Sequence, residues 1–446
     1  MKRKRFFVLA ALFSVAILLA ISNAHAWSLK EAAAPYKGTT ISIMINFHPS
    51  TDATKPLIKE FEEITGITVD QNYMKLQDLR PKMDVEFASG AAPYDISWIG
   101  AGFTDRYVRA GWATPLETFY NNPKLADPEL DLNDFFPGYL QNQKASDGKV
   151  YGLPYTGEGL ILYYRTDILE KAGFDGPPKT YDDLEEICKK VNTPETPCFV
   201  VRASRGRGYS PFSYPLFLYG YGGKWFNDGW NPALDSPEAA AGLEEMVKLL
   251  TTYGPKGVAN YTHYEMYTDF AQGKLVMFID ASVWVSKFNE PTKSNVVGKW
   301  ASASLPAGPA GAFGGALSQG MMVPASSKNK EAAYLFMQWY TSKETQKKRA
   351  LLKEIGSGDV TRMSVIELPE YKKQFSGNNW ANATFTSVKD AVKFWVWDYL
   401  PEGQDLSEAL SISVSKAIAG EETPKDAMKD AQKAFIKILK KNKYLK

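Results

Sequence analysis

Aromatic side chains beside polar residues are the feature of this sequence that most suggests chemistry. The chain of 446 residues contains 11 tryptophans, 24 tyrosines and 24 phenylalanines. A flat ring can cover the C–H face of a sugar, while neighbouring carboxylates and amides bond its hydroxyl groups. Five tryptophans lie within a few residues of Gly, Asn or Asp, namely Trp225, Trp230, Trp284, Trp395 and Trp397. Any one of them is more often a core residue than a ligand platform, but several together favour a carbohydrate site.

Residues for metal or nucleophilic chemistry are few. Beyond residue 26 the histidines are His48 and His263, and the cysteines are Cys188 and Cys198. A zinc set would lack ligands if the cysteines pair, and we find neither a Gly-x-Ser-x-Gly elbow nor a P-loop. We therefore expect no metal, no cofactor, no catalytic residue and no enzyme activity. A periplasmic glycoside hydrolase is the alternative because rings and carboxylates also serve that reaction, but no pair of acids stands out.

Residues 1–26 have the pattern of a secretory signal peptide. Four basic residues at 2–5 precede an apolar run over 6–21, and Ala24-His25-Ala26 ends the stretch with the small-x-small pattern of a cleavage site. The run is shorter than the roughly 20 residues of a membrane span, and an uncleaved anchor is the alternative. No cysteine follows the leader for lipid attachment. We therefore expect a free periplasmic protein.

Export also bears on the charge and on the cysteines. The whole chain has 52 Lys and Arg against 50 Asp and Glu, and loss of the four basic leader residues leaves 48 against 50, a formal charge of −2. Such a balance gives no basic field for nucleic acid and suits a neutral ligand. In an exported chain, two cysteines as close as Cys188 and Cys198 are expected to form a disulfide, with two free thiols as the alternative.

The elements that would position a site alternate between strand and helix patterns. We expect strands over 41–45, 67–69, 93–99 and 274–280, and helices over 56–65, 184–191, 239–250 and up to 438. Capping signals precede three helices: Thr180-Tyr-Asp-Asp183, Ser236-Pro237-Glu238 and Thr423-Pro424-Lys-Asp426. This alternation predicts an α/β protein with a mainly parallel, doubly wound sheet. Because no low-complexity linker divides the chain, two lobes would be joined by more than one crossing.

An ordered set of segments resembles a known family. The matching segments are 57–69, ending Phe-Glu-Glu-Ile-Thr-Gly-Ile-Thr-Val; Pro93-Tyr-Asp-Ile96; Gly148-Lys-Val-Tyr-Gly-Leu-Pro-Tyr-Thr-Gly-Glu158; Leu162-Tyr-Tyr-Arg-Thr-Asp-Ile-Leu169; Tyr219-Gly-Tyr-Gly-Gly-Lys-Trp-Phe-Asn227; Phe270-Ala-Gln-Gly-Lys-Leu-Val-Met277; Ile279-Asp-Ala281; and 323–333. In this order they resemble the family 1 extracellular solute-binding proteins of bacterial ABC importers, which include maltose-binding protein. Within that family the chain is most similar to binders of monosaccharides and polyols.

The resemblance implies a type II periplasmic binding-protein fold with two interwoven α/β lobes and a ligand cleft between them. Lobe I would comprise 27–154 and 318–342, and lobe II 155–317 and 343–446. The crossings would fall near Tyr155, near Phe313 to Gln319, and after Tyr340. It also implies a monomer that delivers a sugar or sugar alcohol to a membrane permease.

The resemblance also implies ligand-binding residues. Glu158, just past the first crossing, would accept bonds from two hydroxyl groups. Trp225 in the Gly-Gly-x-Trp-Phe motif would stack on the ligand. The remaining cleft residues would be His48, Gly102, Tyr155, Arg202, Asp280, Trp284, Gly315 and Gln319. His48 departs in type from the family pattern, and the sequence around Arg202 also departs, which leaves the exact ligand open.

The same fold with a non-sugar ligand remains a further alternative. A polyamine site would need several acids around the aromatic rings, and a peptide is also compatible with the fold. An anion site would use Arg202 or the N-terminus of a helix.

Overall fold

The computed structural model describes residues 27–90, 93–352, 359–375, 377–389, 391, 394–396 and 400–445. The expected signal peptide, residues 1–26, and Trp397 lie outside the described residues. The strands are β1 (Thr40–Asn46), β2 (Thr68–Met74), β3 (Ile96–Gly100), β4 (Leu153–Arg165), β5 (Phe199–Val200), β6 (Met277–Ala281), β7 (Trp300–Ala303) and β8 (Ala316–Met322). Among the described helices, none has the length and apolar character needed to cross a membrane.

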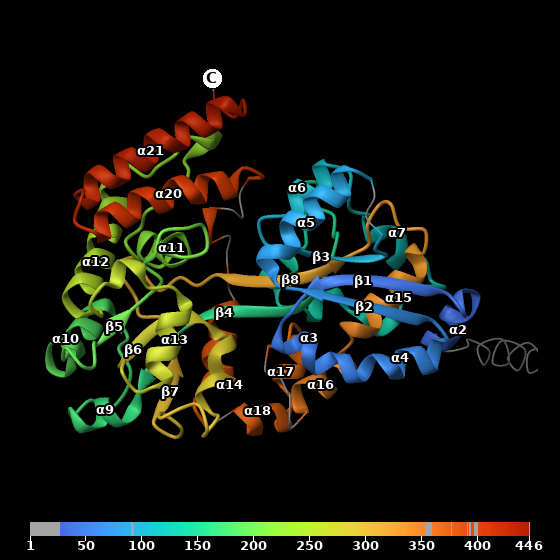
Figure 1. The fold of residues 1–446 in the computed structure, drawn as a ribbon, viewed down its shortest axis with the longest axis horizontal. Coiled ribbons are helices and arrows are strands. Elements are labelled where there is room, and N and C mark those ends of the chain that lie inside the picture. Colours follow the sequence, from blue (N-terminus) through green and yellow to red (C-terminus); the bar gives the residue numbers. More distant parts are fainter. Residues whose placement is uncertain are drawn as a thin grey trace, which may run out of the picture.

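Two buried cores divide the protein into two lobes (Figure 1). The core of lobe I lies around β1, β2 and β3, with helices on their faces: α3 (Pro49–Thr54), α4 (Ile58–Thr65), α5 (Leu76–Ala88), α6 (Thr104–Arg109) and α15 (Lys330–Tyr340). The core of lobe II lies around β5, β6 and β7, with the helices α10 (Tyr181–Val191), α11 (Ser210–Gly220), α12 (Pro237–Tyr253), α13 (His263–Ala271), α20 (Gly403–Ile418) and α21 (Pro424–Lys441).

Local sequence signals account for the ends of several helices. The Thr180 hydroxyl caps α10 by accepting from the Asp183 backbone N–H, and the Asp183 carboxylate accepts from the Thr180 N–H, which confirms the expected capping box. Ser236 and Thr423 cap α12 and α21 in the same manner, each ahead of a proline. Gly66 ends α4 with a left-handed φ of 71°, where a residue without a Cβ is favoured.

The strands form one path in the order β2-β1-β3-β8-β4-β6-β5, with β7 beside β4. The pairs β1–β2, β1–β3 and β5–β6 are parallel, as the alternation of strands and helices predicts. The pairs β3–β8, β4–β8, β4–β6 and β4–β7 are antiparallel. The expectation of a mainly parallel sheet is therefore wrong. The prediction failed because β4 and β8 run between the lobes in opposite directions, and a pattern of local βαβ units does not reveal such long-range pairing.

Three segments pass between the two cores. β4 begins among lobe I residues, with Tyr155 in that core, and Leu160 already belongs to the core of lobe II. β8 returns, since Ala316 lies in the core of lobe II and Met321 in that of lobe I. Figure 1 shows both strands running from one half of the molecule into the other.

The third crossing follows α15; its buried residues Ala350, Val360 and Val365 belong to the core of lobe II, while its helices also contact lobe I. Helix α16 (Lys343–Leu351) packs beside α3, and Lys348 Nζ lies 2.7 Å from Glu60 Oε1 on α4. Further along, Arg362 Nη1 lies 3.2 Å from Asp134 Oδ2. Two residues cross in the other sense, because Phe136 and Tyr139 pack into the core of lobe II. The lobes are thus interwoven by packing as well as by connectivity.

Candidate ligand-binding site

A cleft of about 670 Å³ is lined by residues of both lobes. Pockets that take small molecules commonly measure about 300–1,000 Å³. Lobe I contributes His48, Arg80 and Trp98, and lobe II contributes Arg202, His263 and Trp284. The crossing strands supply Glu158 from β4 and Gln319 from β8. A ligand in this cleft would therefore touch both lobes and the strands that join them.

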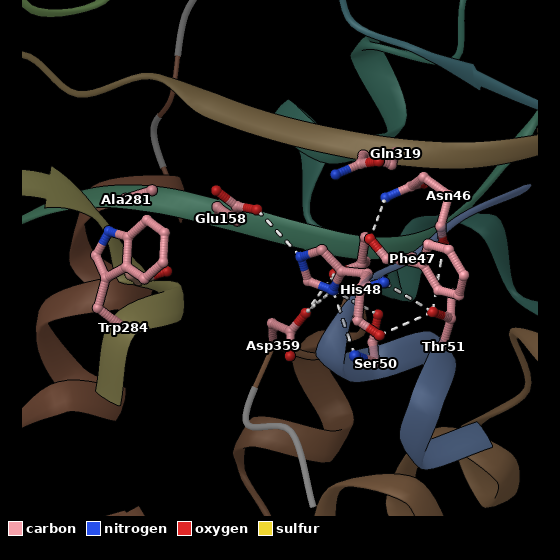
Figure 2. Close-up of polar contacts among 12 residues, drawn as sticks. Asn46, Phe47, His48, Ser50, Thr51, Glu158, Ala281, Trp284, Gln319 and Asp359 are labelled. Atoms are coloured by element: carbon pink, nitrogen blue, oxygen red, sulfur yellow. Dashed lines mark hydrogen bonds and ion pairs between the residues drawn. The ribbon is translucent and has the colours of Figure 1, made fainter. Parts of the chain in front are cut away.

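His48 is placed by the turn that follows β1. It caps α3, accepting at Nδ1 from the Ser50 backbone N–H at 3.3 Å, while the Thr51 hydroxyl accepts from the His48 N–H at 2.9 Å. This capping box fixes the ring with its other edge toward β4. Nε2 lies 3.3 Å from Oε1 of Glu158 (Figure 2).

A second carboxylate, that of Asp359, lies on the other side of the same ring. Its Oδ2 is 3.2 Å from His48 Nδ1, and it accepts a hydrogen bond from the Thr156 hydroxyl. Arg349 holds the backbone here, donating from Nη2 to the Asp359 carbonyl at 2.9 Å and from Nη1 to the Tyr155 carbonyl at 2.6 Å. The third crossing segment thus contributes a residue to the site, which the sequence did not indicate.

The two carboxylates determine the protonation of His48. Burial by itself lowers the pKa of a histidine because it penalises the charged ring. Here Asp359 and the hydrogen bond with Glu158 outweigh burial and raise the pKa of His48 above its usual value. The imidazole is therefore protonated more readily than a free histidine; in its charged form Nδ1 would donate to the Asp359 carboxylate instead of accepting from the Ser50 N–H.

Lobe II builds its part of the site on the end of β6. Asp280 is fully buried and accepts two bonds from Arg202, each of 2.7 Å, so the pair is bidentate. Burial would raise the pKa of Asp280, but Arg202 dominates and lowers it. The same carboxylate accepts from Trp284 Nε1 at 3.0 Å. Asp280 therefore lies behind the cleft wall and orients two residues that line it.

Trp284 belongs to a stack of rings on lobe II. Its ring lies against Tyr267, with centroids 4.6 Å apart and planes 26° apart, and against His263 at 5.6 Å and 16°. Burial lowers the pKa of His263 to about 4, and Arg202 adds to this, so the ring is neutral at pH 7. His263 Nδ1 is buried without a hydrogen-bond partner among the described residues. This stack offers a flat apolar face with a polar atom beside it.

On lobe I, Trp98 and Arg80 line the cleft, and the sequence singled out neither. Trp98 Nε1 donates to Gln319 Oε1 at 3.1 Å, which ties β3 to β8. The Arg80 guanidinium lies over the rings of Trp98 and Phe103 at 4.8 and 4.6 Å. The apolar spacing in α5 places Leu79 and Met83 on the buried face of the helix, and Arg80 lies beside that face. No sequence motif identifies Arg80 as a cleft residue.

Four residues expected in the cleft lie elsewhere. Trp225 is buried in the core of lobe II, where Nε1 donates to the Phe394 carbonyl at 2.9 Å. Tyr155 is buried and its hydroxyl donates to Asn46. Gly315 lies against Phe394 and Trp395, so a Cβ there would come within 2.7 Å of both rings. Gly102 lines a separate cavity of about 70 Å³. A sequence motif identifies a local segment of the chain, whereas tertiary packing decides whether the residues of that segment line the cleft.

Trp230 and Trp395 of the aromatic pattern also lie outside this cleft. Trp395 is buried and donates to the Phe212 carbonyl at 3.0 Å, and Trp230 lies edge-on to Tyr444. Of the expected site residues, the structure brings His48, Glu158, Arg202, Trp284 and Gln319 to one cleft, with Asp280 behind it. Over the part of the chain that is described, no cluster of three metal-ligating side chains occurs. Cys188 and Cys198 form a disulfide, which confirms that expectation.

Comparisons with known proteins fit this architecture. Residues 48–347 match the model of the bacterial extracellular solute-binding protein family. The erythritol/L-threitol-binding protein of Mycolicibacterium smegmatis is 27% identical over 327 residues, which are 70% of this chain and 68% of that protein.

Two solved structures of ABC transporter solute-binding proteins have the same fold. One, from Agrobacterium radiobacter in complex with ribitol, superimposes with a TM-score of 0.77 at 25% identity over 90% of this chain and 99% of the other. Another, from Agrobacterium vitis with bound D-mannitol, gives a TM-score of 0.75 at 27% identity over 91% and 99%. With its matching segments, two lobes and interlobe cleft, the chain belongs to the bacterial extracellular solute-binding protein family.

Proposed function

We propose that the protein captures a sugar or sugar alcohol in the cleft and delivers it to the membrane permease of an ABC importer. It does so as a periplasmic monomer, after removal of residues 1–26. The observation that carries the proposal is the juxtaposition in Figure 2, where Glu158 lies between His48 of lobe I and Trp284 of lobe II. A hydrogen-bonding edge on one side and an aromatic face on the other match the two kinds of surface on a polyol.

Each residue has a role that follows from its contacts. Glu158 uses Oε1 for His48 and leaves its second oxygen to accept from ligand hydroxyl groups. Trp284 covers the C–H groups, and its position is fixed by the bond from Nε1 to Asp280. The Gln319 amide nitrogen has no hydrogen-bond partner in the described part of the chain and can donate to the ligand, while Oε1 accepts from Trp98. These groups come from both lobes, so binding favours the arrangement in which the lobes close together.

The lobes that close are proposed to be 27–154 with 318–342, and 155–317 with 343–446. The change of core along β4, along β8 and after Tyr340 supports these divisions. The crossing strands carry Glu158 and Gln319, so a bend in β4 or β8 would move ligand contacts and lobes together.

The test is a ligand screen by thermal shift and tryptophan fluorescence with erythritol, ribitol, D-mannitol, monosaccharides and polyamines. A ligand at a hundred times its dissociation constant stabilises the folded state by about 2.7 kcal/mol. Glu158→Gln should abolish the shift while circular dichroism shows a folded protein, with a lower melting temperature for the free protein because the ion pair with His48 is lost. The matched control is Glu170→Gln, an exposed glutamate of α9 (Thr166–Lys171) outside the cleft. A shift with polyamines and none with any carbohydrate would overturn the proposal.

We also propose that the protein carries out no reaction on its ligand. The curated and structural relatives described above are binding proteins of transporters. The carboxylates of Glu158 and Asp359 are both engaged with His48 rather than placed to flank a bond of the ligand. Incubation with a panel of glycosides should release no product, and hydrolysis that stops in Glu158→Gln would contradict this.

A further inference from the structure

We propose that Arg80 forms an oxyanion subsite in this cleft, so that the preferred ligand is a polyol or sugar bearing an acidic group, a polyhydroxy acid rather than a neutral polyol. The inference rests on the proposed function, because it concerns the same cleft, and it narrows the class of ligand.

The contacts of the Arg80 guanidinium leave N–H groups at its edge available to a ligand. The rings of Trp98 and Phe103 lie 4.8 and 4.6 Å from it. A guanidinium packed on rings keeps its N–H groups for partners at its edge. Its Nε is buried and has no hydrogen-bond partner, and the head group has no ion pair among the described residues. Arg80 nevertheless lines the cleft, so a ligand can reach it.

The other arginines of the cleft already have carboxylate partners. Arg106 Nη2 lies 2.8 Å from Asp84, and Arg202 is held by Asp280. Arg207 lies 3.7 Å from Glu408. Arg80 differs from these three in having no such partner within 4 Å in the described chain. The unpaired positive charge of the site is thus located at Arg80, not at Arg202.

A lysine of lobe II adds a second positive charge to the cleft. Lys287 of α14 (Val285–Phe288) lines the cleft and forms no ion pair within the described ranges. Two carboxylates line the cleft in the described chain: Glu158 is engaged with His48, and Asp84 is paired with Arg106. An anionic ligand would therefore place its acidic group toward Arg80 and its hydroxyl groups toward Glu158, since two carboxylates repel each other.

The energetics favour an anion at this position. A buried charge without a partner costs free energy, and a hydrogen-bonded counter-charge offsets that cost. Burial lowers the pKa of Arg80 to about 10, so the group remains charged at pH 7. A carboxylate can accept two parallel N–H bonds from the fork, which a single hydroxyl group cannot do.

Isothermal titration with three matched probes tests the proposal: D-mannitol, D-mannonate and D-mannitol 1-phosphate. The wild-type protein should bind at least one of the two anions ten times or more tighter than D-mannitol. Arg80→Gln should lower the affinity for that anion by ten to a hundred times and change that for D-mannitol less than threefold. Arg80→Lys keeps the positive charge but lacks the planar guanidinium, so its affinity for that anion should lie between those of the wild type and of Arg80→Gln. The anion that binds more tightly shows whether the site prefers a carboxylate or a phosphate.

The matched control is Arg205→Gln, which removes one exposed positive charge that does not line the cleft. It should leave the preference unchanged. If D-mannitol binds as tightly as both anions, or if Arg80→Gln weakens all three probes equally while circular dichroism shows a folded protein, the subsite is wrong and the proposed polyol binding stands. If none of the probes, sugars or polyols binds the wild type, the proposed function fails as well.

Discussion

The Nε2 atom of His48 lies 3.3 Å from Oε1 of Glu158, so a ring that caps a helix of lobe I meets a carboxylate on the strand that crosses into lobe II. The two residues are 110 positions apart in sequence, and the family resemblance placed both in the cleft without indicating that they contact each other. It joins the lobes at the floor of the cleft, and its strength depends on the charge of the imidazole. Stability and pH are therefore linked at the ligand site.

The first prediction concerns His48. Because its pKa is raised in the folded protein, its contribution to the free energy of unfolding is fully present below its unfolded pKa of about 6.5 and is lost as pH rises through the folded pKa. His48→Gln should therefore destabilise the protein more at pH 6 than at pH 9, as measured by urea unfolding. Equal losses at the two pH values would show that the ring is neutral throughout.

His263 should titrate in the opposite direction. Its folded pKa of about 4 lies below the unfolded value, so the neutral ring stabilises the protein above about pH 6.5 and this contribution is lost as pH falls toward 4. In a sample of residues 27–446 these are the two histidines of the sequence. Proton NMR should show one imidazole titrating above 6.5 and one near 4, assigned with His263→Gln. Two midpoints near 6.5 would refute the assigned environments.

A third prediction concerns Asp280. Asp280→Asn keeps the shape of the side chain but leaves Arg202 without its counter-charge. Breaking such a buried pair should lower the free energy of unfolding by about 3–5 kcal/mol, measured by guanidinium chloride unfolding. The exposed Asp426→Asn is the control and should have a much smaller effect, limited to its surface contacts with Thr423 and Lys429. A loss for Asp280→Asn no larger than for the control would mean that solvent satisfies Arg202.

Trp225 and Trp284 should separate stability from binding. Trp225→Ala removes a core ring and its hydrogen bond to Phe394, so it should cost about 3–5 kcal/mol of stability. Trp284→Ala should instead weaken binding of the ligand found in the screen by at least about tenfold, the scale of 1.4 kcal/mol, and cost less stability. Thermal unfolding and titration of both variants decide this. Loss of binding in a folded Trp225→Ala protein, with Trp284→Ala unaffected, would reverse the assignment.

The disulfide should act on stability alone. It closes a short loop between the end of α10 and β5, away from the cleft. Cross-linking a loop of this size is worth about 3 kcal/mol in the chain-entropy model. The double change Cys188→Ser and Cys198→Ser should lower the free energy of unfolding by that order and leave ligand affinity unchanged. A change in affinity would show that lobe II transmits strain from this loop to the site.

The sequence determined the local structure where short-range physics decides it. The capping residues Thr180, Ser236 and Thr423 begin the helices that they were expected to begin, and Gly66 ends α4. The close spacing of Cys188 and Cys198 was sufficient to predict the disulfide. The order of the matching segments also predicted the family and its two lobes, because shared sequence motifs indicate a common ancestor and therefore a common fold.

Tertiary packing determines which side chains line the cleft. Trp225 and Trp284 look alike in sequence, each beside polar residues, yet one is buried under Phe394 and the other lines the cleft. No motif marks Arg80 or Asp359; Arg80 lines the cleft and Asp359 contacts His48 because α5 and the third crossing segment pack there. Helix caps depend on neighbours a few residues away, whereas a binding cleft depends on contacts between segments hundreds of residues apart. That difference in range is why the helices and strands can be predicted from the sequence, whereas the orientation of the residues that they carry cannot.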